Sequence, residues 1–185
     1  MSSEFIDSNL PIIYGDNVYL RPLTVEDTDR IVGWRNQEFV RENFIYQKPF
    51  TKEGHFVWIE TMIKTGKVIQ FMICTKQDRP IGSVYLRDID TTHKKAEYGI
   101  FIGEKDALSC GYGTQVAKLI LKYAFEELRL HKVMLRVLAG NDRAKRSYEK
   151  AGFVQEACLQ DEVCINSGYR DVILMACINP GDKEA

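Results

Sequence analysis

The hydrophobic pattern of this chain changes its period several times, and this change most constrains the possible folds. The runs 68–75 and 81–89 are rich in β-branched and aromatic residues, and the polar segment 76–80 between them predicts a hairpin. Residues 113–128 instead place apolar side chains at helical spacing, and another β-rich run follows at 132–138. Antiparallel hairpins combined with a strand–helix–strand crossover indicate a mixed α/β sheet.

The same reasoning places the remaining elements. Further strands are expected at 18–23, 96–102, 154–165 and 169–178, and further helices at about 24–35, 52–64 and 142–150. The total is about seven strands and four helices. The ends, roughly 1–14 and 180–185, are expected to be polar tails. No linker or repeat divides the 185 residues, so we expect a single domain over 1–185 with an ordered core of about 15–179.

Composition excludes several classes of protein. The chain has 25 Lys+Arg against 26 Asp+Glu, which argues against binding nucleic acid through bulk phosphate attraction. No apolar run reaches the ~18–20 residues that span a membrane, and the start does not resemble a signal peptide. The 5 cysteines lack C-x-x-C spacing and the 3 histidines are isolated, which predicts neither disulfides nor a metal site. We expect a reduced, cytoplasmic protein without metal, nucleic-acid or membrane partners.

A loop with two glycines precedes the long predicted helix. The segment Cys110-Gly111-Tyr112-Gly113-Thr114 follows the predicted strand 96–102 after a short connection. Helix starts present unpaired N–H groups and a positive dipole end, which bind phosphate well. Gly111 and Gly113 let the backbone approach a pyrophosphate closely, and Thr114 adds a hydroxyl donor. The alternative is a tight turn and helix cap alone, because neither the Walker loop nor the G-x-G-x-x-G pattern is complete.

The predicted helix 142–150 is a second candidate ligand-binding segment, because it carries a polar face. Asn141 is a favourable N-cap, and Gly152 stands where a helix C-terminus favours a left-handed residue. Asn141 and Tyr148 are about two turns apart and therefore point the same way, with Ala144 keeping the face between them shallow. Such a face can hold a long polar ligand. The alternative is that Tyr148 is an ordinary tyrosine at the edge of the core, with its hydroxyl in water.

These two segments together resemble a known family. The pattern Asn141-x-x-Ala144-x-x-x-Tyr148-x-x-x-Gly152-Phe153 resembles the second acetyl-CoA motif of the GNAT N-acetyltransferase superfamily, and Gly111-Tyr112-Gly113 resembles its pyrophosphate loop. The resemblance extends from about Val18 to Ile178. Trp34-Arg35-Asn36 and Val40-Arg41 are similar to the branch of ribosomal-protein N-terminal acetyltransferases, which also holds acetyltransferases of polyamines and of nucleotide-linked amino sugars. With Tyr169-Arg170-Asp171-Val172, the Trp-Arg-Asn segment is somewhat closer to the amino-sugar members.

The resemblance implies a GNAT-like acyl-CoA N-acyltransferase fold whose fourth and fifth strands splay apart to admit the pantetheine arm of acetyl-CoA. The cofactor residues that it implies are Phe101, Ile102, Ser109, Cys110, Gly111, Tyr112, Gly113, Thr114 and Asn141. Lys145 and Arg146 can reach the cofactor phosphates, although solvated helix charges explain them equally well. Leu108 and Cys110 depart from residues common in the family, which weakens the expected affinity without undoing the assignment, because backbone N–H groups do most of the holding.

Acetyl transfer to an amine needs an acid for the leaving thiolate and a base for the amine. The resemblance places Tyr148 near the thioester sulfur, and a phenol with a pKa of about 10 can protonate a thiolate. Glu97 is the candidate base, because it lies in the strand expected to line the acetyl site. Strand alternation puts it on one face with Gly99 and Phe101. The alternative is a surface glutamate on a partly exposed strand.

The predicted reaction is acetyl transfer to a primary amine of a small molecule, including a nucleotide-linked amino sugar, or to a protein N-terminus, by a monomer or homodimer. Candidate acceptor residues are Trp34, Arg35, Asn36, Arg41 and Tyr46. An acidic groove there favours polyamines, whereas aromatic and basic groups favour a nucleotide sugar. A noncatalytic acyl-CoA-binding regulatory module of the same fold is the alternative; Tyr148 favours the enzyme, and Leu108 and Cys110 mildly favour the module.

Overall fold

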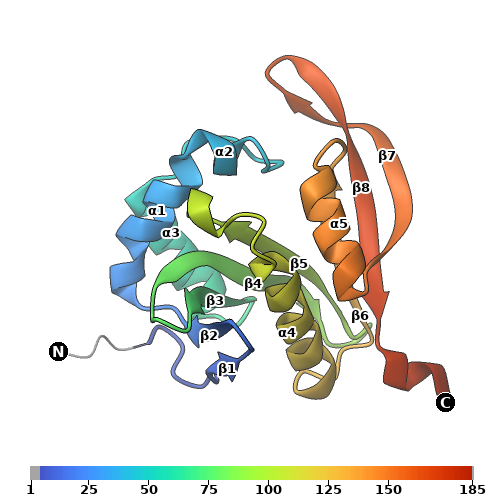
Figure 1. Cartoon of the computed structure of the whole chain (residues 1–185), viewed down its shortest axis with the longest axis horizontal. Coiled ribbons are helices and arrows are strands. Elements are labelled where there is room, and N and C mark those ends of the chain that lie inside the picture. The colour runs from blue at the N-terminus through green and yellow to red at the C-terminus, as the bar shows by residue number, and fades with distance from the viewer. Residues whose placement is uncertain (1–4, 185) are drawn as a thin grey trace.

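One eight-stranded sheet with helices on both faces organises the computed structural model, which describes residues 5–184 (Figure 1). The strand order is β1-β2-β3-β4-β5-β6-β8-β7. The strands are β1 (Ile13–Tyr14), β2 (Val18–Pro22), β3 (Val68–Thr75), β4 (Pro80–Asp90), β5 (Lys95–Ile102), β6 (Lys132–Leu138), β7 (Val154–Ile165) and β8 (Gly168–Ile178). Among the described strands only β5 and β6 pair in parallel, and the other neighbours pair antiparallel.

The helices fall in two groups along the chain. The α-helices are α1 (Thr28–Asn36), α2 (Glu38–Arg41), α3 (Lys52–Trp58), α4 (Tyr112–Glu126) and α5 (Asp142–Ala151). A 3-10 turn at Val25–Asp27 leads into α1, and a π-helical turn at Ile59–Ile63 continues α3. Shorter 3-10 turns occur at Lys105–Ala107 and Pro180–Glu184. Helix α4 is the crossover between the parallel strands, and this arrangement confirms the predicted mixed α/β sheet.

Two predictions differ from the structure at the edges of the chain. The expected polar tail over 1–14 is wrong for residues 13 and 14, which form β1 against β2 because Ile13 packs on the core. Residues 180–184 of the other expected tail form a 3-10 turn, in which Asp182 Oδ2 lies 2.7 Å from His131 Nδ1. Residues 1–4 and 185 lie outside the described part. The count of about four helices missed α2, whose few residues are too short to set a period.

Two hydrophobic clusters cover the two faces of the sheet. Helix α4 buries the apolar face predicted for it, including Val116, Ile120 and Ala124, against the inner strands. The other face holds the second cluster, in which α1 and the π-helical turn place Ile31, Trp34 and Ile59. A break in the sheet would therefore let one ligand contact both faces.

The break lies between β5 and β6. Their parallel pairing begins at Lys95 and Lys132 and ends at Glu97 and Met134. Beyond Glu97, β5 continues to Ile102, and β6 stays paired with β8 on its other side. The expectation of splayed central strands is confirmed; they are the fifth and sixth strands here because β1 adds one. Separation leaves backbone groups of β5 without a strand partner on that side.

Candidate active site

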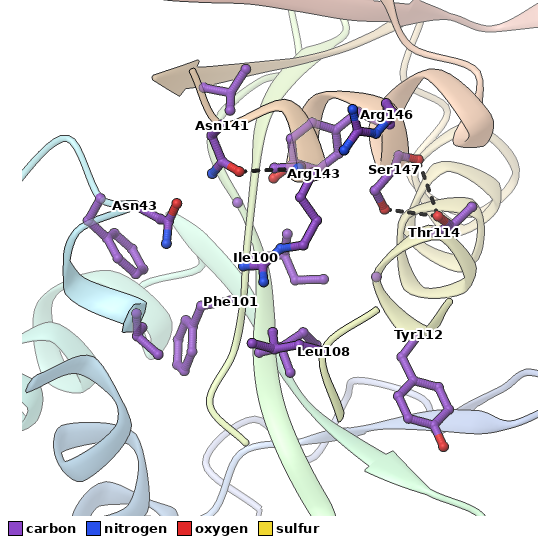
Figure 2. Close-up of a pocket in the computed structure, with 18 of the residues that line it drawn as sticks. Asn43, Ile100, Phe101, Leu108, Tyr112, Thr114, Asn141, Arg143, Arg146 and Ser147 are labelled. Carbon is purple, nitrogen blue, oxygen red and sulfur yellow. Dashed lines mark hydrogen bonds between the residues drawn. The ribbon is translucent and has the colours of Figure 1, made fainter. Parts of the chain in front are cut away.

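A cavity of about 430 Å³ opens where β5 and β6 separate. The start of α4 and one face of α5 line one side of it, and residues 39–46 around α2 line the other. Figure 2 shows Thr114, Ser147 and Arg143 on the first side, with Asn43 and Phe101 across from them. The cavity therefore joins both segments that the sequence singles out.

The start of α4 has the conformation expected of an anion-binding loop. Gly111 is the N-cap residue, with the left-handed φ of 80° that glycine adopts readily. The first helical residues, Tyr112, Gly113 and Thr114, therefore present N–H groups without an intrahelical partner beside the cavity. Their position fits the pyrophosphate contact implied by the resemblance.

Helices α4 and α5 meet at this loop. A Cβ added at Gly113 would lie 3.3 Å from Ser147 Oγ, so glycine allows the close approach. Thr114 Oγ1 and Ser147 Oγ share a hydrogen bond of 2.9 Å. The Thr114 hydroxyl, predicted as a ligand donor, thus also ties the two helices together.

Helix α5 is capped as its sequence predicts. Asn141 Oδ1 accepts a hydrogen bond from the Ala144 N–H at 3.2 Å. Gly152 takes a left-handed φ of 112° at the C-cap. Because the cap uses the oxygen of Asn141, its Nδ2 remains a donor for a ligand in the cavity, which Asn141 and Tyr148 both line.

Most of the predicted cofactor residues lie together at the cavity, and two do not. Those that line it are Phe101, Ile102, Ser109, Gly111, Tyr112, Gly113, Thr114 and Asn141. The side chain of Cys110 is exposed, with its Sγ directed at the carbonyls of Asp106 and Leu108 at 3.4 and 3.5 Å. Lys145 is also absent from the described lining.

Helix α5 supplies three of the basic side chains of the cavity, from positions other than Lys145. Arg143, Arg146 and Lys150 line it. Lys145 follows Arg143 by two residues, which is about 200° around the helix, so it faces away. The described lining holds no carboxylate, and the α5 cations lie on the same side as the start of α4. This site fits a long anionic ligand such as a coenzyme with a pyrophosphate.

Tyr148 lies at the inner end of this face. Its ring packs edge-to-face on Tyr98 and Phe153, with centroid distances of 6.0 and 5.9 Å. Within the described chain its hydroxyl makes no hydrogen bond, although the side chain lines the cavity. Burial, followed by the nearby Tyr85, raises the pKa of Tyr148 above its usual 10.0, so the phenol keeps its proton at neutral pH.

Glu97 lies on the face of the sheet opposite to that of Tyr98 and Tyr148, as strand alternation predicts. It is not among the described cavity-lining residues. Its carboxylate is half-buried at 17% exposure and accepts from Arg87 Nη2 at 2.6 Å and Arg136 Nε at 3.4 Å. Both bonds fall on Oε1, and Oε2 accepts no hydrogen bond from the described residues. Glu97 is therefore part of an ion-pair group rather than a free surface glutamate.

Sequence reasoning missed the partners of Glu97. Arg87 pairs directly opposite Glu97 across β4 and β5, and Tyr85 pairs opposite Gly99. A Cβ at Gly99 would lie 2.2 Å from Tyr85 Cζ, so the tyrosine ring occupies the space that the glycine leaves. The alternation of Tyr85 and Arg87 was visible in the sequence, but the register that joins them to Glu97 was not.

The candidate acceptor residues play different parts. Trp34 is core at 3% exposure, and its Nε1 donates to Glu104 at 2.9 Å. Asn36 bonds the Phe50 backbone through its Nδ2 at 2.7 Å and its Oδ1 at 2.9 Å, which fixes the loop after α2. Tyr46 lines the cavity, whereas Arg41 is absent from its described lining.

Arg35 is the most unusual of these candidates. Its guanidinium lies 3.6 Å from the Phe44 ring centroid and 4.9 Å from that of Phe50. Its Nε is buried and has no hydrogen-bond partner among residues 5–184, and burial lowers the pKa of this guanidinium. Phe44 lines the cavity, so Arg35 lies directly behind the acceptor-side wall.

Two further kinds of feature are absent from residues 5–184. No group of His, Cys, Asp and Glu side chains is placed to hold a metal ion. No helix has the length and apolar character needed to cross a membrane.

Comparison with known proteins agrees with this geometry. The family described as "Acetyltransferase (GNAT) domain" matches residues 17–154. A probable N-acetyltransferase of Bacillus subtilis, YjcK, is 29% identical over 94% of this chain and 100% of its own length. A Vibrio cholerae spermidine N(1)-acetyltransferase is 36% identical over 56% of this chain and 59% of its own.

A solved structure is similar over almost the whole fold. The crystal structure of Vibrio cholerae spermidine N-acetyltransferase with CoA and spermine aligns with a TM-score of 0.83 and 27% identity, covering 89% of this chain and 96% of the other. The resemblance inferred from the glycine loop and the α5 motif is confirmed. The chain belongs to the GNAT family of acetyltransferases.

Proposed function

We propose that this protein transfers an acetyl group from acetyl-CoA to the primary amine of an acceptor. The observation that carries the proposal is a single cavity bounded by the capped start of α4, the open edge of β5, Asn141 and Tyr148. Acetyl-CoA supplies the activated acetyl group. This chain is similar over 89% of its length to a solved enzyme with bound CoA, and this similarity supports the choice of cofactor.

The residues that would hold acetyl-CoA follow from their positions. The N–H groups of Tyr112 to Thr114 would bind the pyrophosphate, and Arg143 and Arg146 would neutralise its phosphates. Asn141 Nδ2 and the unpaired backbone of β5 would hydrogen-bond the pantetheine arm. Leu108 lines the same region without adding charge.

The side chains at the inner end can supply the proton transfers. A backbone N–H at the open edge of β5 can stabilise negative charge on the thioester oxygen. Tyr148, whose raised pKa keeps it protonated, would give its proton to the departing sulfur. Glu97 would take the amine proton through a water molecule at Oε2, because Oε1 is already bonded to two guanidiniums.

The acceptor is a primary amine of a small molecule, such as a nucleotide-linked amino sugar, or of a protein N-terminus. Spermidine is named for the Vibrio relatives and is a third candidate. We further propose that the chain works as one domain, as a monomer or homodimer in the cytoplasm.

A thiol-release assay tests the reaction. Acetyl-CoA is combined with single amines that include spermidine, an amino sugar, a nucleotide-linked amino sugar and a short peptide, and free CoA is measured against time. We expect thiol release that depends on at least one amine and yields the acetylated amine by mass spectrometry. Tight binding of acetyl-CoA without release for any amine would instead indicate the noncatalytic module.

A further inference from the structure

We infer that the acceptor carries an anionic group, a phosphate or a carboxylate, beside its amine, and that Arg87 and Arg136 bind this group. The inference rests on the proposed acetyl transfer and narrows its substrate class.

The two arginines and Glu97 form a cluster in which positive charges outnumber negative ones. Arg87 on β4 and Arg136 on β6 both line the cavity and both bond the same oxygen of Glu97, at 2.6 and 3.4 Å. Their side chains are 23% and 27% exposed, so neither is sealed in the core. Two guanidiniums against one carboxylate leave a net positive charge, and each guanidinium keeps N–H groups beyond those bonded to Glu97.

The charges around this group are positive on balance. Burial raises the pKa of Tyr85, and the nearby charges that act on this hydroxyl are those of Arg87, Arg35, Arg136 and Glu97, three cations against one anion. Arg87 also has Asp88 at 3.6 Å, but that side chain is 70% exposed and its attraction is screened by water. Arg35 forms no ion pair within the described chain, and aromatic rings are its contacts.

A polycation fits this wall poorly. The described residues that line the cavity include no Asp or Glu, so the several ammonium groups of a polyamine would meet arginines, with Glu97 behind them already bonded to both Arg87 and Arg136. The smaller neighbouring hollow holds Glu42 and Arg170, one charge of each sign, and does not reverse the balance.

An anionic acceptor fits it well. A guanidinium binds a phosphate or carboxylate through paired N–H donors, and such charge-assisted bonds are stronger than neutral ones. Phe44 and Tyr46, which also line the cavity, offer aromatic surface for a sugar or base. With the anion at Arg87 and Arg136, the amine of the same molecule can lie near the gap between β5 and β6.

Matched amines separate charge from shape. Glucosamine is compared with glucosamine 6-phosphate, butylamine with 4-aminobutyrate, and spermidine serves as the polycation. We expect kcat/KM for the anionic member of at least one pair to exceed that of its neutral partner about tenfold at low ionic strength, and the excess to shrink in salt. The first pair tests a phosphate and the second a carboxylate.

Substitution of Arg136 tests whether the arginines cause the preference for anionic acceptors. Arg136→Gln should raise KM for the preferred anionic acceptor about tenfold, and Arg136→Lys should recover part of the loss. The KM for acetyl-CoA should stay within about twofold in both. Lys122→Gln on α4, outside the described cavity lining, removes one positive charge as the control, and thermal melting checks that each variant folds.

Calorimetric binding of the same amines, in the presence of CoA, keeps this inference distinct from the proposed reaction. Anionic amines that bind through Arg136 without turnover would support the inference and refute the acetyl transfer. Neutral amines or spermidine that match the anionic amines in both pairs would overturn the inference while leaving acetyl transfer standing. A charge preference that survives Arg136→Gln and Arg87→Gln would also overturn it.

Discussion

At the gap between β5 and β6, the two faces of the sheet carry side chains of different chemical character. On the α4–α5 face the inner end of the cavity is neutral and aromatic, with Tyr98, Tyr148 and Phe153 packed together. On the α1–α3 face the corresponding level is charged, with Arg87 and Arg136 joined through a carboxylate. The first face suits a phenol that must keep its proton, and the second suits recognition of a charged group.

The largest expected effect comes from the neutral face. Tyr148→Phe should lower kcat about 10²–10³-fold, because the departing sulfur loses its proton donor, while acetyl-CoA KM changes little. Since the pKa of Tyr148 is raised above 10.0, the wild-type rate should show no loss from this group between pH 7 and pH 9.

The matched control for this variant is Tyr14→Phe, which alters an exposed tyrosine on β1. Single-turnover rates, measured for both variants across pH, separate chemistry from product release. An unchanged rate in Tyr148→Phe would remove the acid role and leave only a packing role for this face.

The second-largest expected effect concerns the α1–α3 face and is a pH dependence of the free energy of unfolding. His55 on α3 is buried at 1% exposure, its Nδ1 lies 3.1 Å from Thr28 Oγ1, and burial lowers its pKa to about 4. The folded pKa is below the unfolded value of about 6.5, so this group's contribution is present above pH 6.5 and is lost as pH falls toward 4. We expect a loss of about 3 kcal/mol of unfolding free energy over that interval.

Urea unfolding at several pH values, for the wild type and His55→Gln, measures this contribution. The variant should show a shallower fall below pH 6.5, whereas His93→Gln at an exposed site should behave as the wild type does. Parallel curves for the wild type and His55→Gln would show that acid sensitivity has its origin elsewhere in the molecule.

The same two faces differ in how far the sequence predicts them. The cofactor side comes from two contiguous segments, 110–114 and 141–152, whose glycines, cap and spacing can be read locally. The acceptor side depends on the register of β4, β5 and β6 and on a loop fixed by Asn36. Register is a property of long-range pairing, so the local sequence did not show that Tyr85, Arg87 and Arg136 come together at the acceptor side.

Lys145 shows the limit even within a recognised motif. The helix was predicted correctly, but of the two cations named for the phosphates Arg146 lines the cavity and Lys145 is absent from its described lining, because the motif fixes Asn141 and Tyr148 and not which neighbouring cation faces the cavity. Strand β1 was not predicted from the sequence, because two residues are too few to show a hydrophobic period. Only the pairing with β2 reveals this strand.

A third effect separates capping from ligand binding at Asn141. Asn141→Ala removes the cap and the free amide, so it should cost about 1 kcal/mol of stability and raise acetyl-CoA KM severalfold. Asn141→Asp keeps an oxygen for the Ala144 N–H but lacks Nδ2, so it should raise KM similarly while leaving the melting temperature near that of the wild type. If KM in Asn141→Asp matches the wild type, the amide has no role in cofactor binding.

The smallest effect decides between neighbouring cations on α5. Arg146→Gln should raise acetyl-CoA KM about threefold, because it removes one partly solvated phosphate contact, and Lys145→Gln should change it by less than the error of the assay. Both variants remove one positive charge from the same helix, so they share any effect of net charge or helix dipole. Equal KM values for the two would mean that the long-range field of α5, rather than contact from its cavity-facing side, attracts the coenzyme. A larger effect at Lys145 would place the phosphates beyond the cavity rim, on the side of the helix first inferred from sequence.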